Sequence, residues 1–184
     1  MEWDLYISGT GGQGIQLAAK TLGLAAMAEG CEVMLTSEYG GEMRGGPSRA
    51  SVVITRGKMQ ALPVLASAGS AIAMHHLHWA RTAERLRRGA LVLVDAATAK
   101  EIAPDPNWKF VSVPATEIAS EAGNMMAGCM TIVSAYAALN QIVDVEGFVA
   151  AMKTVVPAYR RQHVQVNESA IRAGFQWAQT RAAA

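Results

Sequence analysis

The glycines near the start of the chain are the first residues whose spacing indicates chemistry. Gly9, Gly11 and Gly14 fit the pattern G-x-G-x-x-G, between the apolar run at residues 4–8 and a helical pattern over residues 15–28. Glycines between a strand and a helix let backbone N–H groups approach an anion at the positive end of the helix. The loop therefore indicates a phosphate site, and a tight turn that binds nothing is the alternative.

A second glycine-rich loop follows at residues 38–47, where Glu42 and Arg44 stand between pairs of glycines. Ordering a charged pair that is flanked by glycines costs conformational entropy, so we expect this loop to have a role that offsets the cost. The planar guanidinium of Arg44 suits a phosphate or carboxylate, and Gly45 and Gly46 would let a ligand or another chain lie close. A solvated loop with a surface ion pair is the alternative.

Glu38 stands near the place where dinucleotide-binding folds carry a carboxylate for the ribose, about 20 residues beyond the glycine loop. In those folds a helix soon follows the carboxylate, whereas Glu38 opens the second loop. A stand-alone NAD-binding protein is therefore an alternative function, although this sequence shows neither a substrate domain nor a catalytic pair.

Four further polar side chains could take part in chemistry. His75, His76 and His78 lack a carboxylate partner at helical spacing, so we interpret them as the start of a helix or loop, not as a metal site or proton shuttle. Asp95 ends the apolar run at residues 90–95, where open α/β sheets place their ligands. A cap of the following turn explains Asp95 equally well.

Composition excludes several classes of protein. The formal net charge of +1 lacks the basic excess of a nucleic-acid binder, and no apolar run approaches the roughly 20 residues that span a bilayer. Cys31 and Cys129 lie far apart, so we expect no disulfide scaffold, zinc site or iron–sulfur cluster held by this chain alone. Cys129 is expected in the core. With no signal-peptide pattern at the start, we expect a cytoplasmic protein without nucleic-acid or membrane partners.

The order of elements predicts an α/β fold. With 51% hydrophobic residues the chain can bury a large core, and its low share of charged residues, 17%, suggests that other subunits cover part of its surface. The first strand, helix and strand are expected to form a βαβ unit with two parallel neighbouring strands. We expect one Rossmann-like three-layer domain over residues 1–184 with a mostly parallel sheet. Strands are expected at residues 4–8, 32–37, 48–55, 90–95 and 110–114, and helices at 15–28, 79–88, 115–140, 145–155 and 164–182, with Asp144 as an N-cap.

Four patterns along the chain carry a family resemblance. They are GTGGQGIQLAAK at residues 9–20, YGGEMRGGPS at 39–48, Asn124-Met125-Met126 before an apolar helix, and the spacing of Asn167, Ala170 and Gly174. Together they resemble the gamma subunit of 2-oxoacid:ferredoxin oxidoreductases over nearly the whole chain. Gly41 departs from the Pro that many members carry, which loosens the loop but leaves Glu42 and Arg44 in place.

The resemblance implies a subunit without redox chemistry of its own. In that family the complete enzyme decarboxylates a 2-oxo acid on thiamine diphosphate, passes electrons through [4Fe–4S] clusters and forms an acyl-coenzyme A. The resemblance places thiamine diphosphate and Mg²⁺ on alpha and beta subunits and the clusters on a delta subunit, with ferredoxin or NAD as the acceptor. It gives the gamma chain a part in coenzyme A binding and in covering the active site.

We therefore expect a chain that is inactive alone and holds neither catalytic residues nor metal ligands. A purely structural adaptor is a third hypothesis. For Lys20, a solvated helix position is the alternative to a phosphate contact. The residues expected to bind the cofactor are Gly11, Gly12, Gln13, Gly14, Lys20, Glu42, Arg44, Gly45, Gly46, Ser48 and Asn124.

Overall fold

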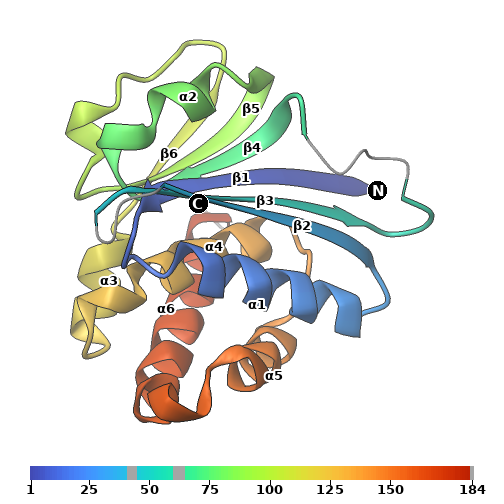
Figure 1. The fold of residues 1–184 in the computed structure, drawn as a ribbon, viewed down its shortest axis with the longest axis vertical. Coiled ribbons are helices and arrows are strands. Elements are labelled where there is room, and N and C mark those ends of the chain that lie inside the picture. The colour runs from blue at the N-terminus through green and yellow to red at the C-terminus, as the bar shows by residue number, and fades with distance from the viewer. Residues whose placement is uncertain (41–44, 60–64, 183–184) are drawn as a thin grey trace.

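The computed structural model describes residues 1–40, 45–59 and 65–182, and these build one six-stranded sheet (Figure 1). The strand order is β2-β3-β1-β4-β5-β6, and β1, β4, β5 and β6 are parallel neighbours. Only β3 runs against the others, paired antiparallel with both β1 and β2. The strands are β1 (Glu2–Thr10), β2 (Glu32–Tyr39), β3 (Pro47–Thr55), β4 (Ala68–Ala73), β5 (Leu86–Asp95) and β6 (Lys109–Val113).

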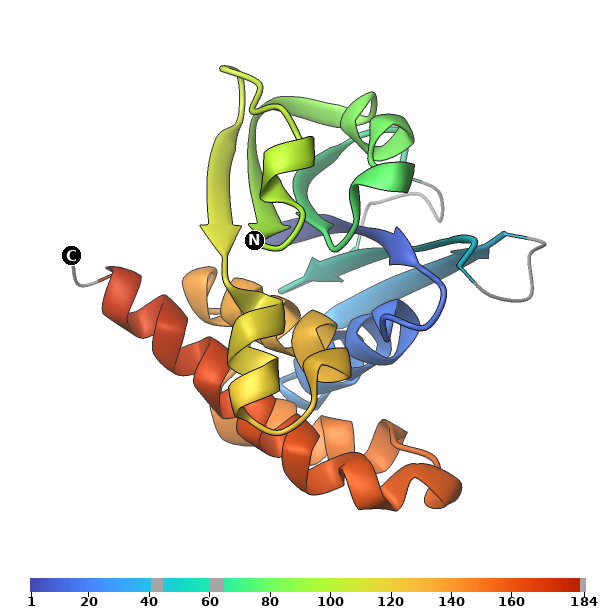
Figure 2. The ribbon, with the colours of Figure 1, turned by 90° about the vertical axis from the view of Figure 1, so that its left-hand side faces the viewer.

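Helices cover the two faces of the sheet unequally, which gives a Rossmann-like three-layer α/β fold. The long helices lie on one face, and Figure 2 shows α6 (red) running along the outer side of this layer, where it packs against α3, α4 and α5. The other face carries short helical turns. The large layer holds α1 (Ile15–Ala28), α3 (Ala115–Glu121), η3 (Met125–Ala127), α4 (Gly128–Leu139), α5 (Val145–Val155), η4 (Ala158–His163) and α6 (Val164–Ala182), and the small layer holds η1 (His76–His78), α2 (Ala80–Ala83) and η2 (Ala99–Glu101).

Strand β1 contributes side chains to both hydrophobic cores, because successive side chains of a strand point to opposite faces of the sheet. Leu5 and Ile7 enter the large core under the long helices, whereas Tyr6 enters the smaller core with Trp79. Helix α4 is buried almost all round, and Cys129 on it is a core residue as expected. Burial raises the pKa of the Cys129 thiol well above its ordinary value.

Three helices have the bounds that the sequence predicts, namely α1, α5 and α6. Gly30 follows α1 in the left-handed conformation, with a φ of 82°. The Asp144 carboxylate caps α5 by accepting a hydrogen bond from the Gly147 backbone N–H at 2.6 Å. Pro157 follows the end of α5.

The predicted parallel pairing of the first two strands is wrong. Strand β3 lies between them and pairs with β1 along its whole length, from Glu2 opposite Thr55 to Thr10 opposite Pro47. Antiparallel pairing needs only a short connection from β2, and β3 is buried along most of its length, so it fits the centre of the sheet. Strand β2 is left at the sheet edge, where most of its residues are exposed or half-buried.

The predicted basic helix at residues 79–88 is also wrong. Helix α2 ends at Ala83, and β5 already begins at Leu86, which pairs with Ala68 of β4. Arg87 is held by an ion pair of 2.6 Å between its Nη2 and the Asp4 carboxylate of β1. Pairing with other parts of the chain thus overrides the local helical pattern.

The predicted helical segment at 115–140 is interrupted. Gly123 adopts a φ of 109°, and the Asn124 side chain accepts a hydrogen bond from the Met126 N–H at 3.0 Å to start the short turn η3. The interruption places Asn124 at a turn and not inside a helix. Among the described helices, none combines the length and the apolarity needed to cross a membrane.

Candidate functional site

The two glycine loops meet at one corner of the sheet. Because β1 and β3 pair Thr10 with Pro47, the loop after β1 and the loop before β3 lie side by side. The Gly11 N–H donates a hydrogen bond of 2.8 Å to the Gly46 carbonyl. A side chain on Gly11 would place its Cβ 3.6 Å from the Gly45 nitrogen. The two segments singled out by sequence are therefore in direct contact.

The first glycine loop is held in shape by its glutamine. Gln13 accepts a hydrogen bond from the Thr10 N–H at 2.8 Å and donates one to the Met74 carbonyl at 3.0 Å. Gly12 and Gly14 have φ values of 102° and 78°, and Gly14 is the N-cap of α1 without a side-chain cap. The positive end of α1 is thereby left open toward a ligand.

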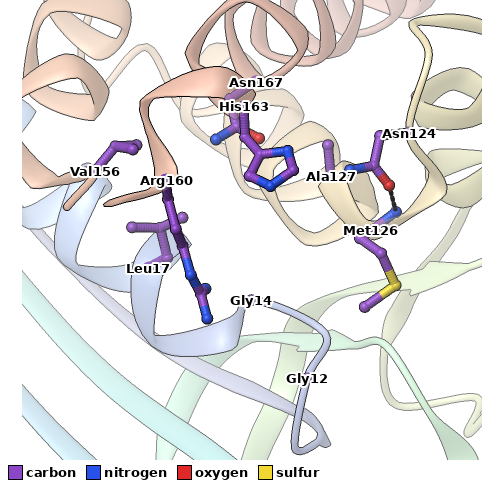
Figure 3. Close-up of a pocket in the computed structure, with 10 residues that line it drawn as sticks. All are labelled: Gly12, Gly14, Leu17, Asn124, Met126, Ala127, Val156, Arg160, His163 and Asn167. Carbon is purple, nitrogen blue, oxygen red and sulfur yellow. Dashed lines mark hydrogen bonds between the residues drawn. The ribbon is translucent and has the colours of Figure 1, made fainter. Parts of the chain in front are cut away.

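A pocket of about 340 Å³ opens over this end of α1 (Figure 3). Four separate segments supply its walls: the glycine loop with the first turn of α1, the turn η3, the end of α5 with η4, and the start of α6. Its lining residues are Gly12, Gly14, Leu17, Asn124, Met126, Ala127, Val156, Arg160, His163 and Asn167.

The chemistry of the pocket suits an anion with apolar parts. Arg160 extends from η4 toward the glycine loop, and His163 lies beside Asn167 (Figure 3). Asn167 is 9% exposed, and its side chain has no hydrogen-bond partner among the described residues. The described lining contains no carboxylate, so a guanidinium, an imidazole and a helix N-terminus converge without an opposing charge. Leu17 and Val156 form the apolar wall.

Comparison with known proteins places this chain in a family. Residues 4–177 match the family described as pyruvate ferredoxin/flavodoxin oxidoreductase. The chain belongs to this family.

Two curated relatives and one solved structure are similar to this chain. The 2-oxoglutarate synthase subunit KorC of Methanothermobacter thermautotrophicus is 33% identical over 84% of this chain and 85% of its own. The ketoisovalerate oxidoreductase subunit VorA of Methanothermobacter marburgensis is 32% identical over 96% of this chain, which spans 37% of that relative. The gamma subunit of a keto/oxoacid ferredoxin oxidoreductase from Geobacter sulfurreducens superposes with a TM-score of 0.80 at 25% identity, covering 97% of this chain and 99% of its own. The resemblance to gamma subunits is confirmed.

The structure of this gamma-type chain brings together three of the predicted site residues in the pocket, namely Gly12, Gly14 and Asn124. Gly11, Gly45 and Gly46 lie next to it at the contact between the loops. The Gln13 side chain is engaged within the loop itself.

The remaining predicted residues lie elsewhere. Ser48 is buried behind the loop, where its hydroxyl accepts a hydrogen bond from Gln16 at 3.3 Å. Lys20 is exposed on α1 and does not line the pocket. Glu42 and Arg44 lie outside the described residues, so their assignment stays a prediction.

Sequence reasoning missed Arg160 and His163, and it noted Asn167 only as part of the tail pattern. A signal was present: residues 159–163 read YRRQH, a basic turn directly before the last helix. This basic turn lies near the glycine loop only because α6 packs across α4.

The alternative NAD-binding interpretation finds no support in the geometry. A dinucleotide fold places its second strand beside the first, whereas here β3 separates them. The Glu38 carboxylate lies 3.5 Å from Arg49 and lines a small pocket with Arg81 of α2, on the opposite face of the sheet from the pocket over α1.

Two of the histidines have structural contacts through their rings, whereas the His78 Nε2 is buried without a hydrogen-bond partner in the described part of the chain. His76 Nδ1 lies 3.1 Å from the Thr98 hydroxyl, and His75 Nδ1 accepts a hydrogen bond from the Leu77 N–H at 3.2 Å. Burial, followed by the nearby His76 and His78, lowers the pKa of His75. Over residues 1–40, 45–59 and 65–182, no three His, Cys, Asp or Glu side chains are arranged to hold a metal ion.

Asp95 acts as a cap in this structure. One carboxylate oxygen accepts a hydrogen bond from the Thr116 N–H at 3.2 Å, and the other accepts one from the Thr116 hydroxyl. Since Thr116 lies in the first turn of α3, both contacts tie the end of β5 to that helix. The carboxylate thus caps the first turn of α3 and not the turn that directly follows Asp95, so the predicted cap is at the wrong place, and a ligand role of Asp95 stays a prediction.

Proposed function

We propose that this gamma-type chain binds part of coenzyme A in a 2-oxoacid oxidoreductase complex, which oxidatively decarboxylates a 2-oxo acid to an acyl-coenzyme A. The observation that carries the proposal is the convergence of Arg160, His163 and the open end of α1 on one pocket without a carboxylate. In the assembled enzyme the chain would also cover the active site. It would carry no turnover alone.

The pocket and coenzyme A have matching chemistry. Coenzyme A carries phosphate groups and a pantetheine arm with amides, and the volume of about 340 Å³ is at the lower end for small-molecule sites. One phosphate-bearing portion would therefore enter. Backbone N–H groups near Gly14 and the Arg160 guanidinium would bind phosphate oxygens. The Asn167 amide and the NH₂ group of Asn124, whose Oδ1 already accepts from Met126, would pair with the amides of the arm.

The redox groups belong to partner subunits in this proposal. A [4Fe–4S] cluster is held by cysteine thiolates, and this chain has two cysteines, both buried, one before β2 and one in α4. They do not fit a cluster. Alpha and beta subunits would hold thiamine diphosphate with Mg²⁺, which supplies the decarboxylation chemistry. A delta subunit would hold the clusters and pass electrons to ferredoxin or NAD.

The test uses two adjacent arginines in the assembled complex. Arg160 lines the pocket, whereas the neighbouring Arg161 is also exposed and does not line it. Arg160→Ala is expected to raise KM for coenzyme A roughly tenfold, because a charge-assisted contact to phosphate is lost. KM for the 2-oxo acid should stay unchanged. Arg161→Ala is the control and should leave both constants near wild type.

Two outcomes would contradict the proposal. If both variants keep the wild-type KM for coenzyme A, the pocket does not bind it. If Arg160→Ala instead prevents assembly, measured by size-exclusion chromatography, the adaptor hypothesis is favoured. The side chains of Leu77, Met125 and Met126, each more than half accessible, are exposed apolar groups that partner subunits could contact under that hypothesis.

A further inference from the structure

A second, smaller pocket lies on the other face of the sheet, beside α2. It has a volume of about 150 Å³ and is formed where β2 ends, where β3 begins and where α2 comes over them. Its described lining consists of Glu38, Tyr39, Gly40, Pro47, Arg49 and Arg81. None of these residues lines the pocket assigned to coenzyme A.

Arg49 is the least exposed charged residue of this pocket. The register of the sheet places it opposite Ser8, whose hydroxyl donates to the His78 carbonyl at 3.4 Å, so both side chains face the α2 layer. The Arg49 side chain is 14% exposed, and its Nη1 lies 3.5 Å from the Glu38 carboxylate. Its Nε is buried without a hydrogen-bond partner in the described part of the chain.

A buried guanidinium N–H without an acceptor is costly, because the group has lost its water and gained nothing in exchange. Glu38 contacts Arg49 through Nη1 and leaves Nε without an acceptor among the described residues. An oxygen ligand placed there would satisfy the unpaired N–H. The donor has no acceptor in the described part of the chain, and a bound oxyanion is a group that would supply one.

Arg81 adds a second positive charge at the same place. It lines the pocket from α2, is exposed, and forms no ion pair with another described residue. Two guanidinium groups thus face one carboxylate, and the described lining keeps an excess positive charge. Pairs of planar guanidinium groups suit carboxylate and phosphate oxygens.

We propose that this pocket, named here the Arg49–Arg81 site, binds one small oxyanion, a carboxylate or a phosphate group. Its volume of about 150 Å³ is below the range of sites for whole small molecules, so it fits a single charged group. Arg49 donates to it through Nε, Arg81 adds charge from above, and Glu38 competes with the anion for Arg49. The proposal does not depend on coenzyme A binding elsewhere.

The test follows the arginine Nε–Hε resonances of the full chain by NMR during titration with inorganic phosphate and, separately, with acetate, at constant ionic strength. The Arg49 resonance is expected to shift saturably with at least one anion at concentrations up to roughly 10 mM. The phosphate and acetate arms distinguish the two sources of the oxyanion. Backbone signals of Gly12 and Gly14 report separately on the pocket over α1.

Three variants are expected to change the anion affinity in different directions. Arg81→Ala should weaken anion binding roughly fivefold to tenfold, whereas Glu38→Gln should strengthen it because the competing carboxylate is gone. Arg88→Ala removes an exposed arginine of β5 outside the pocket and should change nothing. The proposal is overturned if neither anion shifts the Arg49 resonance saturably, or if Arg88→Ala weakens binding as much as Arg81→Ala.

Discussion

Gly174 and Gly12 have the same side chain for opposite physical reasons. Gly174 lies on α6 where it crosses α4, and a Cβ there would collide with the Ser134 hydroxyl and the Thr131 carbonyl. Gly12 lies in the first glycine loop with open space around it, but its φ of 102° is one that side chains rarely adopt. One glycine allows close packing, and the other allows an unusual backbone shape.

Gly174 is needed for helix packing, whereas Gly12 lies where a ligand would bind. The contact around Gly174 is filled on all sides by protein, so a change there alters the position of α6 and, through it, the pocket wall at Asn167. The space around Gly12 is open to the pocket, so a change there meets the ligand first. The two positions therefore predict different balances of stability and binding.

The largest effect is expected from Gly174→Ala. Its methyl group must push α4 and α6 apart, which we expect to lower the free energy of unfolding by about 3 kcal/mol. Urea unfolding followed by circular dichroism measures the change. Gln176→Ala on the exposed side of the same helix is the control and should stay within about 0.5 kcal/mol of wild type. Equal stability of both variants would show that the helix contact has room to adapt.

A smaller loss is expected from Gly12→Ala. The new Cβ meets no atom within 4 Å, so the cost is that of left-handed backbone alone, about 1–2 kcal/mol. Coenzyme A affinity of the assembled enzyme should fall by more than the stability loss explains, because the methyl group enters the pocket. A loss of stability as large as that of Gly174→Ala would contradict the distinction between the two glycines.

A third, still smaller loss is expected from Asp144→Ala, which removes the N-cap of α5. The Gly147 N–H loses its acceptor, and the free energy of unfolding should fall by about 1 kcal/mol. Asp144→Asn keeps a side-chain oxygen and should recover most of this loss. If both variants destabilise equally, the charge matters and not the hydrogen bond.

The smallest effect is expected from acid. A hydrogen bond from Arg172 lowers the pKa of Glu146, and hydrogen bonds from Lys153 and then Arg172 lower that of Glu168. Folded pKa values below the unfolded ones mean that this stabilisation is present above the ordinary value of 4.5 and is lost as pH falls through the lowered values. These groups are exposed, so the change is small. Arg172→Gln should flatten the dependence of unfolding free energy on pH in this range.

Local chemistry allowed the helix bounds to be predicted from sequence. The cap at Asp144 and the glycine at position 30 act within a few residues, and α1 and α5 have the predicted limits. The place of β3 could not be predicted in this way, because alternation reveals a strand but not its neighbours. The ion pair of Arg87 with Asp4 joins residues far apart in sequence, and no local pattern shows it.

The pocket was predictable on one side. The glycine spacing indicated an anion at the start of α1, and Asn124 came from the family resemblance. Arg160 and His163 were missed because their segment follows a proline and reads as an irregular basic turn. They face the glycine loop only through the long-range packing of α6 on α4, which depends on Gly174.

The central place of β1 in the sheet also determines when the fold can be completed during synthesis. The first strand of this sheet to leave the ribosome, β1, has partners on both sides, β3 from Pro47 and β4 from Ala68 onward. Until those residues emerge, β1 exposes two unpaired edges and the apolar side chains of both cores. The nascent chain is therefore expected to be most prone to aggregation, and most dependent on chaperones, before β4 is made.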